Sequence, residues 1–571
     1  MNKIKYILFL LLIIHIGRSM GQAAQRYDII ISEIMADPTP NIGLPAVEYI
    51  ELHNRQPQKF LLHNWTLKLG NTMKPLPDIE IDSNGYVVII ADKNKELFSP
   101  YCSNFITLSS LSITDGGQSI VLSDKDGYVI HYVSFKNNWH SEPVKREGGW
   151  SLEMIDEDLP CHGKDNWSSS CADIGGTPGK PNSIVRATGD FNAPNLERVT
   201  LLNDSTVRLF FSESIRPTEP TSSSLVNISP HIEIRRITEV PPDFSALDLH
   251  LSEAIHPNVQ YLASVSENLC DCAQNFMTAE SLLFGIPSQP VAGDIVINEV
   301  LSHPYDGADA DFIEIYNNSS KIIDLKDIKI GSGGDELPLK AICAVSSGRQ
   351  LMPQGYCALC KDKEHTSSHY YCQNTALQQN DSLPAFANDN GVIFLSTSGL
   401  QTLDKFIYSV DMHYSGLTST EGVSLERLDA DRPTQDGTNW HSAAFTAGFA
   451  TPGYKNSQTA TGTGIDDIAF YPEVFSPNND GFEDFTELAL HFSDIENRTT
   501  IQIFNHTGNS VKHLANNEPC GNEAFYRWDG TDDNGNLLPS GSYIAVIHWW
   551  NANGKNKRVQ KVISIFDRDK R

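Results

Sequence analysis

Two pairs of glutamates occupy matching places in the two halves of the chain. Glu33 and Glu51 stand in "IISEIM" and "EYIELHN", and Glu299 and Glu314 stand in "VINEVL" and "DFIEIYN". Two carboxyl groups at a set separation are what glycoside hydrolysis needs. Side chains alternate between the two faces of a strand, so Glu33 should share its face with apolar neighbours such as Ile31. We therefore expect structural carboxylates that accept backbone hydrogen bonds at a sheet edge, with a hydrolase site at these glutamates as the alternative.

A cluster of zinc-ligand residue types lies in the second half of the chain, at Cys357, Cys360, His365, His369 and Cys372. A Cys-x-x-Cys step is the usual bite of a tetrahedral zinc site. The first two cysteines align with an apolar, strand-like stretch earlier in the chain, and residues three apart in a strand point to opposite faces. Disulfides or buried thiols are therefore the favoured interpretation, and zinc is the alternative.

Two acidic turns carry the oxygen ligands that calcium prefers. One is "NNDGFED", from Asn478 to Asp484, and the other is "DGADAD", from Asp306 to Asp311. Neither is a full EF-hand loop with its closing glutamate, and turns rich in Asn and Asp also form without any ion. We therefore expect no cofactor, with calcium at the first turn as the alternative. The candidate ligands are Asn478, Asp480, Glu483 and Asp484.

Motifs of nucleophilic and phosphate chemistry do not occur in the sequence. It holds no Gly-x-Ser-x-Gly elbow, no His-Glu-x-x-His pair and no Gly-x-x-x-x-Gly-Lys loop. Trp549 and Trp550 could form a platform for a sugar ring, because aromatic faces bind apolar ligand surfaces. Neighbours in a strand face opposite ways, however, so one tryptophan in the core and one at the surface is the favoured interpretation. These observations predict a protein that is not an enzyme.

The charge of the chain excludes one class of partner. There are 43 Lys and Arg residues against 71 Asp and Glu, which gives a formal net charge of −28. Nucleic-acid affinity comes largely from Lys and Arg that displace counterions, so no nucleic-acid partner is expected. The last residues are basic instead, and carry Lys555, Lys557, Arg558, Lys561, Arg568, Lys570 and Arg571. This end suits an anionic surface or a sorting partner, although solvated strand ends have the same composition.

The first residues have the composition of an export signal. Lys3 and Lys5 precede the apolar run "YILFLLLIIHI", and small residues follow it. We therefore assign residues 1–24 as a signal peptide and expect an exported protein. Ten cysteines fit an oxidising compartment. Cys161 and Cys171 are the easiest to pair with each other, and the pairing of the other eight is left open.

The sequence contains an internal repeat. "DIIISEIMADPTP" begins at Asp28 and "DIVINEVLSHPYD" begins at Asp294, and later phrases such as "SLEMID" and "SLERLD" return in the same order. Short β-branched runs between clusters of Gly, Pro and Asn are typical of strands and turns. Two all-strand copies of roughly 160 residues imply sandwiches or barrels.

The repeated phrases resemble the bacterial lamin-tail domain, an Ig-like β-sandwich, along nearly the whole of both copies. This resemblance implies a binding or structural module and no reaction. The segment between the copies resembles the Ig-like modules of bacterial surface-layer proteins, on "FSE" at 211–213 and a later loop at 271–275. The end of the chain, with "FSPNNDG" and "WDGTDDNG", resembles the C-terminal domains of gliding-motility-associated and hook-cap-like proteins. In type IX secretion such domains often serve as the export and surface-attachment signal.

The expected fold is therefore all-β, with tandem Ig-like β-sandwiches along one chain. A Thr- and Gly-rich linker that cannot bury a core is expected at 459–467. The expected domains are the lamin-tail copies at 26–186 and 292–458, the Ig-like domain at 190–289 and the C-terminal Ig-like domain at 468–568.

We expect a non-catalytic protein of the outer cell surface. It would be a structural or adhesive array whose inter-strand loops bind a protein or a glycan, and its C-terminal domain would attach it to the outer membrane. The alternatives are a hydrolase or hydrolase-accessory protein with a carboxylate site in one lamin-tail copy, and calcium-dependent glycan binding.

Overall fold

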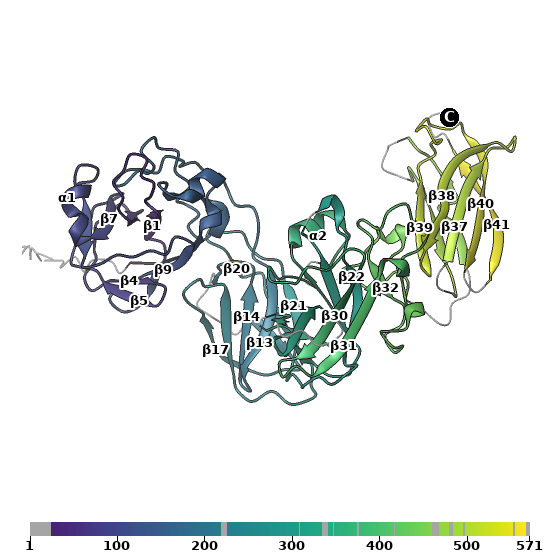
Figure 1. Cartoon of the computed structure of the whole chain (residues 1–571), viewed down its shortest axis with the longest axis horizontal. Helices are drawn as coiled ribbons and strands as arrows, with labels where there is room; N and C mark the ends of the chain where they lie inside the picture. The colour runs from purple at the N-terminus through teal and green to yellow at the C-terminus, as the bar shows by residue number, and fades with distance from the viewer. Residues whose placement is uncertain are drawn as a thin grey trace, which may run out of the picture. The chain divides into compact units, whose positions relative to one another are not determined.

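The regular secondary structure of the protein consists mainly of β-strands in separate sheets (Figure 1). The computed structural model describes residues 24–217, 225–307, 309–333, 341–345, 348–373, 376–415, 417–459, 467–478, 483–494, 497–551 and 554–566. Residues 1–23 of the predicted signal peptide lie outside these ranges. The α-helices of the described chain are α1 (Lys95–Phe98) and α2 (Lys363–His369), and no helix there has the length and hydrophobicity of a membrane span. The predicted all-β class of tandem sandwiches is confirmed.

The chain divides into two compact units. The first unit holds residues up to Glu197 together with Thr206–Glu253 and Ala263–Leu282, and the second holds the remainder. The first lamin-tail copy and most of the Ig-like segment therefore belong to the first unit. The second copy and the C-terminal domain belong to the second unit.

Two main sheets build the first lamin-tail copy. The six-stranded sheet has the order β12-β11-β1-β2-β7-β8, and the four-stranded sheet has the order β10-β9-β4-β5. Their apolar faces form one core, which includes Ile50, Val87 and Ile120. The strands are β1 (Ile29–Met35), β2 (Tyr49–Asn54), β3 (Phe60–Leu61), β4 (Thr66–Leu69), β5 (Thr72–Pro75), β6 (Glu80–Ile81), β7 (Tyr86–Ala91), β8 (Phe105–Leu108), β9 (Gly117–Ser123), β10 (Val129–Lys136), β11 (Leu152–Met154) and β12 (Trp167–Ser169).

Strand β1 lies inside the six-stranded sheet and is buried along its whole length. A bulge between Ile31 and Glu33 interrupts its pairing with β2. A bulge shifts the alternation of side chains, so Glu33 leaves the face of Ile31. Glu33 lies instead on the face of Met35 and Tyr49, whose apolar cluster is separate from the main core. The predictions that Glu33 shares a face with Ile31 and stands at a sheet edge are therefore both wrong.

The segment between the two copies is also built of strands. β14 (Thr206–Phe211) pairs with β18 (Ala246–Leu251), which pairs with β17 (Ile234–Glu239), and all are antiparallel. β14 alternates between buried and half-buried residues, as one sheet of a sandwich requires. The other strands are β13 (Leu196–Asn203), β15 (Arg216–Pro217), β16 (Val226–Ser229), β19 (Tyr261–Val265), β20 (Leu269–Cys270) and β21 (Glu280–Phe284).

The second lamin-tail copy repeats the topology of the first strand for strand. Its sheets have the orders β29-β28-β23-β22-β32-β33 and β26-β25-β30-β31, and the bulge recurs between Ile297 and Glu299. The internal repeat is therefore a duplicated fold. The strands are β22 (Ile295–Leu301), β23 (Phe312–Asn317), β24 (Ile323–Asp324), β25 (Ile328–Ser332), β26 (Ile342–Cys343), β27 (Gln350–Leu351), β28 (Tyr356–Cys360), β29 (Leu377–Gln379), β30 (Asn390–Thr397), β31 (Thr402–Ser409), β32 (Leu425–Arg427) and β33 (Trp440–Ser442).

The C-terminal domain is a two-sheet sandwich with the strand orders β34-β36-β39 and β35-β41-β40-β37-β38. Trp549 is fully buried in its core, whereas Trp550 is half-buried. The prediction that these neighbours face opposite ways is confirmed. The strands are β34 (Asp467–Tyr471), β35 (Val474–Phe475), β36 (Thr486–His491), β37 (Asn497–Phe504), β38 (Ser510–Cys520), β39 (Glu523–Trp528), β40 (Gly541–Asn551) and β41 (Asn556–Ile565).

Candidate functional site

Three glutamates lie side by side on the six-stranded sheet of the first lamin-tail copy. Glu33 of β1 is the register partner of Glu51 in β2 on one side and of Glu153 in β11 on the other. We call Glu33, Glu51 and Glu153 the first glutamate row. None of the three has exposed surface. Carboxyl groups buried this closely need hydrogen-bond donors, because each would otherwise cost several kcal/mol of desolvation.

A segment that follows β12 supplies many of these donors. We call residues 176–184 the first strap, and its donors reach each glutamate in turn. They are the Thr177 amide to Glu33 Oε1 (2.8 Å), the Gly179 amide to Glu51 Oε2 (2.6 Å) and Ser183 Oγ to Glu153 Oε2 (2.8 Å). Gly179 has a φ of +80°, and a Cβ there would lie 2.7 Å from Cys102 Sγ. The strap therefore needs glycine at the point where it crosses Glu51.

Burial raises the pKa values of Glu33 and Glu51. The pKa of Glu33 is raised to about 7, first by the loss of solvent and then by the charge of Glu153, while Ser151 Oγ, which donates to it at 2.6 Å, acts in the opposite direction. Burial and the charge of Glu33 raise the pKa of Glu51 well above its ordinary range. Glu33 and Glu51 therefore hold protons near neutral pH, beneath the strap and out of contact with solvent.

The second copy builds the same arrangement. Its glutamate row is Glu299, Glu314 and Glu426, again without exposed surface, and its strap is residues 450–458. The strap donors are the Thr451 amide to Glu299 (2.9 Å), the Gly453 amide to Glu314 (2.6 Å) and the Gln458 amide to Glu426 (2.9 Å). The pKa of Glu299 is raised to about 8 by burial and by the charge of Glu426. The prediction that these glutamates accept backbone hydrogen bonds is confirmed. Neither row presents a solvent-accessible carboxylate of the kind that the hydrolase alternative requires.

The two copies differ in how they satisfy the backbone amide at the β-bulge. In the first copy the Ile31 amide donates to His131 Nδ1 at 2.9 Å. In the second copy the Ile297 amide donates to Asp404 Oδ2, also at 2.9 Å. The same backbone position is thus bonded to an imidazole in the first copy and to a carboxylate in the second. The second arrangement requires a cation nearby, because a buried carboxylate without one is costly.

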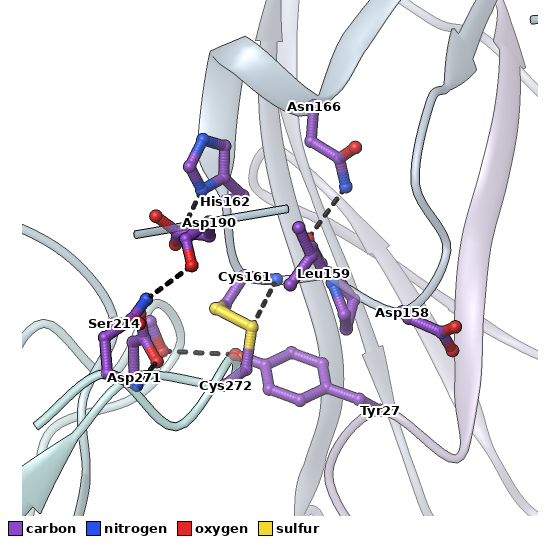
Figure 2. Close-up of a disulfide and its surroundings, with 12 residues drawn as sticks. Tyr27, Asp158, Leu159, Cys161, His162, Asn166, Asp190, Ser214, Asp271 and Cys272 are labelled. Atoms are coloured by element: carbon purple, nitrogen blue, oxygen red, sulfur yellow. Dashed lines mark hydrogen bonds and ion pairs between the residues drawn. A yellow bond between two sulfur atoms is a disulfide. The ribbon is translucent and has the colours of Figure 1, made fainter. Parts of the chain in front are cut away.

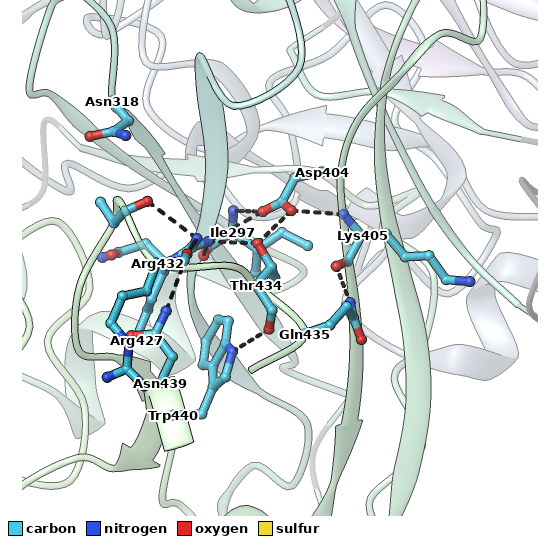
Figure 3. Close-up of polar contacts among 12 residues, drawn as sticks. Ile297, Asn318, Asp404, Lys405, Arg427, Arg432, Thr434, Gln435, Asn439 and Trp440 are labelled. Atoms are coloured by element: carbon cyan, nitrogen blue, oxygen red, sulfur yellow. Dashed lines mark hydrogen bonds and ion pairs between the residues drawn. The ribbon is translucent and has the colours of Figure 1, made fainter. Parts of the chain in front are cut away.

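A buried arginine provides that cation (Figure 3). Arg427 is 3 % exposed, and its guanidinium lies 3.4 Å from Asp404 Oδ2. It also donates to the Ile297 carbonyl at 3.1 Å and to Thr434 Oγ1 at 2.9 Å. The first copy has Met154 at the equivalent place. Our sequence interpretation missed this cluster, and its signal was the change from "SLEMID" to "SLERLD".

The predicted cysteine and histidine cluster does not assemble as a metal site. Cys357 faces the main core of the second copy, whereas Cys360 belongs to a separate cluster on the other side of the sheet. His365 and His369 stack on each other in α2 with ring centroids 4.1 Å apart. Within the described ranges, three metal-ligating side chains do not converge here. The buried-thiol interpretation is confirmed for Cys357 and Cys360.

Among the described cysteines, a disulfide joins Cys161 to Cys272 (Figure 2). The predicted pairing of Cys161 with Cys171 is wrong. Cys171 is a free, exposed cysteine. Its backbone amide donates to Ser183 Oγ in the first strap at 2.8 Å. The pair is close in sequence, but β12 (Trp167–Ser169) runs between the two cysteines and separates them. The disulfide instead joins the first lamin-tail copy to the Ig-like segment, across 111 residues.

Further contacts join these two parts of the first unit. The Arg26 guanidinium lies 3.6 Å from the centroid of the Phe244 ring and pairs with Glu239. Tyr27 places its hydroxyl 3.1 Å from Ser214 Oγ, beside the disulfide (Figure 2). A covalent bond, an ion pair and a stacked cation therefore fix the lamin-tail copy against the Ig-like segment.

Three carboxylates converge next to the disulfide. Oxygens of Asp190, Glu213 and Asp271 lie within 4.8 Å of one another. His162 Nδ1 lies 2.8 Å from Asp190 Oδ2, and the Asn275 amide donates to Asp271 at 2.8 Å. The pKa of Glu213 is raised to about 7 by burial and by the charges of the other two acids. The sequence motifs at 211–213 and 271–275 supplied two of these acids, but nothing in the sequence indicated that they meet.

The predicted calcium ligands fall only partly within the described residues. Asp480 lies outside them, whereas Asn478, Glu483 and Asp484 are half-buried or exposed. Calcium at this turn therefore stays a prediction. At the other acidic turn, Lys361 pairs with Asp309 and with Asp311 at 3.6 Å.

Family models match the chain at both ends of the described region. A Lamin Tail Domain model matches residues 22–137, and a CHU_C type IX secretion signal domain model matches residues 469–565. The chain contains a lamin tail domain and a type IX secretion signal domain. Both resemblances predicted for these segments are confirmed. A type IX secretion signal marks a protein for export, so this protein is exported and located at the cell surface. A comparison with curated proteins finds no match.

Several solved structures of surface proteins are similar to the chain at low identity. The S-layer protein rSbsC shares 9 % identity at a TM-score of 0.16, over 66 % of this chain and 54 % of its own. A Ca²⁺-stabilized adhesin of an ice-binding Antarctic bacterium shares 9 % sequence identity at a TM-score of 0.12, and the match covers 95 % of this chain and 99 % of the adhesin. PorZ, a surface component of the type IX secretion system of Porphyromonas gingivalis, shares 11 % sequence identity at a TM-score of 0.16. The match covers 79 % of this chain and 56 % of PorZ. The chain thus spans about half the length of the S-layer protein it matches.

Proposed function

We propose that this exported lamin-tail protein is a non-catalytic surface scaffold, an array of rigid β-sandwiches whose loops bind a protein or a glycan. The observation that carries the proposal is the pair of glutamate rows. Their six carboxyl groups are fully buried and are bonded to the straps, so they close the sandwiches and do not meet a substrate. A rigid sandwich with solvated loops is a common architecture for recognition without catalysis.

Direct packing between domains supports a scaffold. In the second unit, the Arg498 guanidinium lies 3.3 Å from the centroid of the Tyr414 ring, and Asn517 Nδ2 donates to the Tyr414 hydroxyl at 3.1 Å. A Cβ at Gly521 would lie 1.9 Å from the Ser457 carbonyl oxygen. The second lamin-tail copy and the C-terminal domain therefore contact each other closely. In the first unit the disulfide has the corresponding role.

Attachment to the outer membrane through the C-terminal domain is the second part of the proposal. It is tested by fractionating cells that express the full chain or a chain without residues 469–571. We expect the full chain at the cell surface and the truncated chain in the periplasm, with limited proteolysis to verify that the truncated chain is folded. A folded, truncated chain that still reaches the surface would contradict this role.

The absence of catalysis is tested with the buried glutamates themselves. We expect the purified wild type to release no sugar from a panel of polysaccharides, and Glu51→Gln to behave identically. Glu253→Gln, at an exposed glutamate of the Ig-like segment, is the matched control. Hydrolysis by the wild type that a folded Glu51→Gln protein lacks would establish the hydrolase alternative.

A further inference from the structure

A cavity of about 290 Å³ lies in the first unit, where the first lamin-tail copy meets the Ig-like segment. Its volume is close to the lower end of known small-molecule pockets, which is about 300 Å³, and domain junctions are favoured places for such pockets. The aromatic side chains that line it are Tyr27, Tyr132, Trp139, Trp167, Phe211 and Phe244. The cavity thus offers ring surfaces from both parts of the unit.

The two walls of the cavity are fixed before any ligand enters. Cys161 lines the cavity and is disulfide-bonded to the Ig-like segment. Arg26 is stacked on Phe244 across the junction, and the Tyr27 hydroxyl lies against Ser214 (Figure 2). A preformed site loses less conformational entropy on binding than one that must be ordered.

One carboxylate in the lining has no hydrogen-bond partner within the part of the chain that the structure describes. This carboxylate belongs to Glu213, which is half-buried and lies beside Asp190 and Asp271. The cation nearest in the lining is already used, because Arg26 pairs with Glu239. The cavity therefore has a local excess of negative charge next to its aromatic rings.

His131 does not supply the missing positive charge. It lines the cavity, and its Nδ1 accepts a hydrogen bond from the Ile31 amide, which requires that Nδ1 carry no proton. Burial lowers the pKa of His131 to about 4, so the ring is neutral at physiological pH. His162 Nδ1 lies 2.8 Å from Asp190 Oδ2, and the charge of His162 also acts on Glu213. Among the residues that line the cavity, Arg26 is the only Lys or Arg, and it pairs with Glu239 rather than with Glu213.

We propose that this cavity binds an alkylammonium group, carried by a small organic amine or by a lysine side chain of a partner protein. Aromatic faces attract cations, and a carboxylate forms a charge-assisted hydrogen bond or ion pair with them. The Arg26 guanidinium over Phe244 shows that a ring of this wall already holds a cation. An anionic ligand would be repelled by the three acids, and a hydrocarbon would leave Glu213 unmatched.

The test compares ligands of equal shape and different charge on the full-length exported chain. Binding of choline and of its neutral isostere 3,3-dimethylbutanol is measured by calorimetry and by ligand-detected NMR. We expect saturable binding of choline and at least about tenfold weaker binding of the isostere, because the isostere lacks the charge that the rings and Glu213 attract. N-acetyl-lysine methylamide in the same assay distinguishes a small amine from a lysine side chain of a partner protein. Tighter binding than choline indicates a lysine side chain, and weaker binding indicates a small amine.

Glu213→Gln locates the binding to this cavity, because it keeps the side-chain volume and should remove the preference for choline over its isostere. Glu253→Gln is the matched charge control. Equal binding of choline and the isostere to the wild type, unchanged preference in Glu213→Gln, or no binding of any amine would each overturn the proposal. Saturation by calcium alone, abolished by Glu213→Gln, would assign the acids to a metal instead.

Discussion

Replacing Glu33 with glutamine should make the first lamin-tail copy less sensitive to rising pH. The pKa of Glu33 is raised from 4.5 to about 7 by burial and by Glu153. A group whose pKa is higher in the folded state contributes stability that is complete below its unfolded pKa and is lost as the pH rises to its folded pKa. At about 1.4 kcal/mol per pKa unit, the wild type loses about 3 kcal/mol between pH 4.5 and pH 7 from this residue. The variant loses none from this position.

Glutamine fits the hydrogen bonds around Glu33. The Glu33 Oε1 atom accepts from Tyr49 OH at 2.7 Å, from Ser151 Oγ at 2.6 Å and from the Thr177 amide at 2.8 Å, and a glutamine carbonyl can accept the same three. Thr177 Oγ1 donates to Glu153 at 3.0 Å, which leaves its lone pairs free to accept the glutamine NH₂. We therefore expect Glu33→Gln to be at least as stable as the wild type at pH 8.

The assay is hydrogen exchange of the first strap, 176–184, followed by mass spectrometry on the full chain from pH 5 to pH 8. After correction for the intrinsic exchange rate, strap protection should fall with pH in the wild type and should fall less steeply in Glu33→Gln, in which only Glu51 of the two raised groups remains. Glu299→Gln should change only the second strap, 450–458, and thereby controls for global effects. Wild-type protection that rises with pH, or an identical pH slope in Glu33→Gln, would refute the reasoning.

Three other predictions follow from the geometry. Replacing Cys161 and Cys272 with alanine should destabilise the first unit by about 4 kcal/mol in calorimetric unfolding, because the bridge closes a loop of 111 residues; an unchanged transition would contradict this. Arg427→Met should cost about 3 to 5 kcal/mol in denaturant unfolding because Asp404 loses its cation, and adding Asp404→His, which restores the residue types of the first copy, should recover most of the loss. Failure of the double variant to recover would show that the two bulge sites are not equivalent. Calcium should raise the melting temperature of the C-terminal domain if residues 478–484 bind it, and a chelator should reverse the rise; identical melting with and without calcium removes the site.

The strands and the duplication could be predicted because their signals are local. β-branched runs such as "IIISEIM" and "IVINEVL" favour strands by themselves, and the repeated order of phrases indicates one fold used twice. The opposite facing of Trp549 and Trp550 also follows from the period of a strand. Each of these inferences depends on neighbours in the sequence and on no distant contact.

The failed predictions depend on contacts between distant residues. The bulge at Ile31 moved Glu33 to the other face of the sheet, and a one-residue shift of this kind leaves no mark in an apolar run. Cys161 is bonded to Cys272 because the Ig-like segment packs beside the first copy. The spacing of cysteines along the chain does not indicate this packing. The strap was part of the repeated motif, but only the structure shows that its backbone amides are the donors to the buried glutamates.

Each strap is the last part of its lamin-tail copy before the chain continues to the next domain. The first strap lies inside the loop that the Cys161–Cys272 disulfide closes, so the disulfide shields it from a tensile force along the chain. The second strap would receive such a force before the strands do. The bonds from Thr451, Gly453 and Gln458 follow one another along this strap, so they would break in succession at low force and would not share the load. Water would then reach the released acids, and their ionisation and mutual repulsion at neutral pH would slow reclosure. A lamin-tail copy of this kind would lengthen and dissipate work under shear while its sandwich core stayed folded.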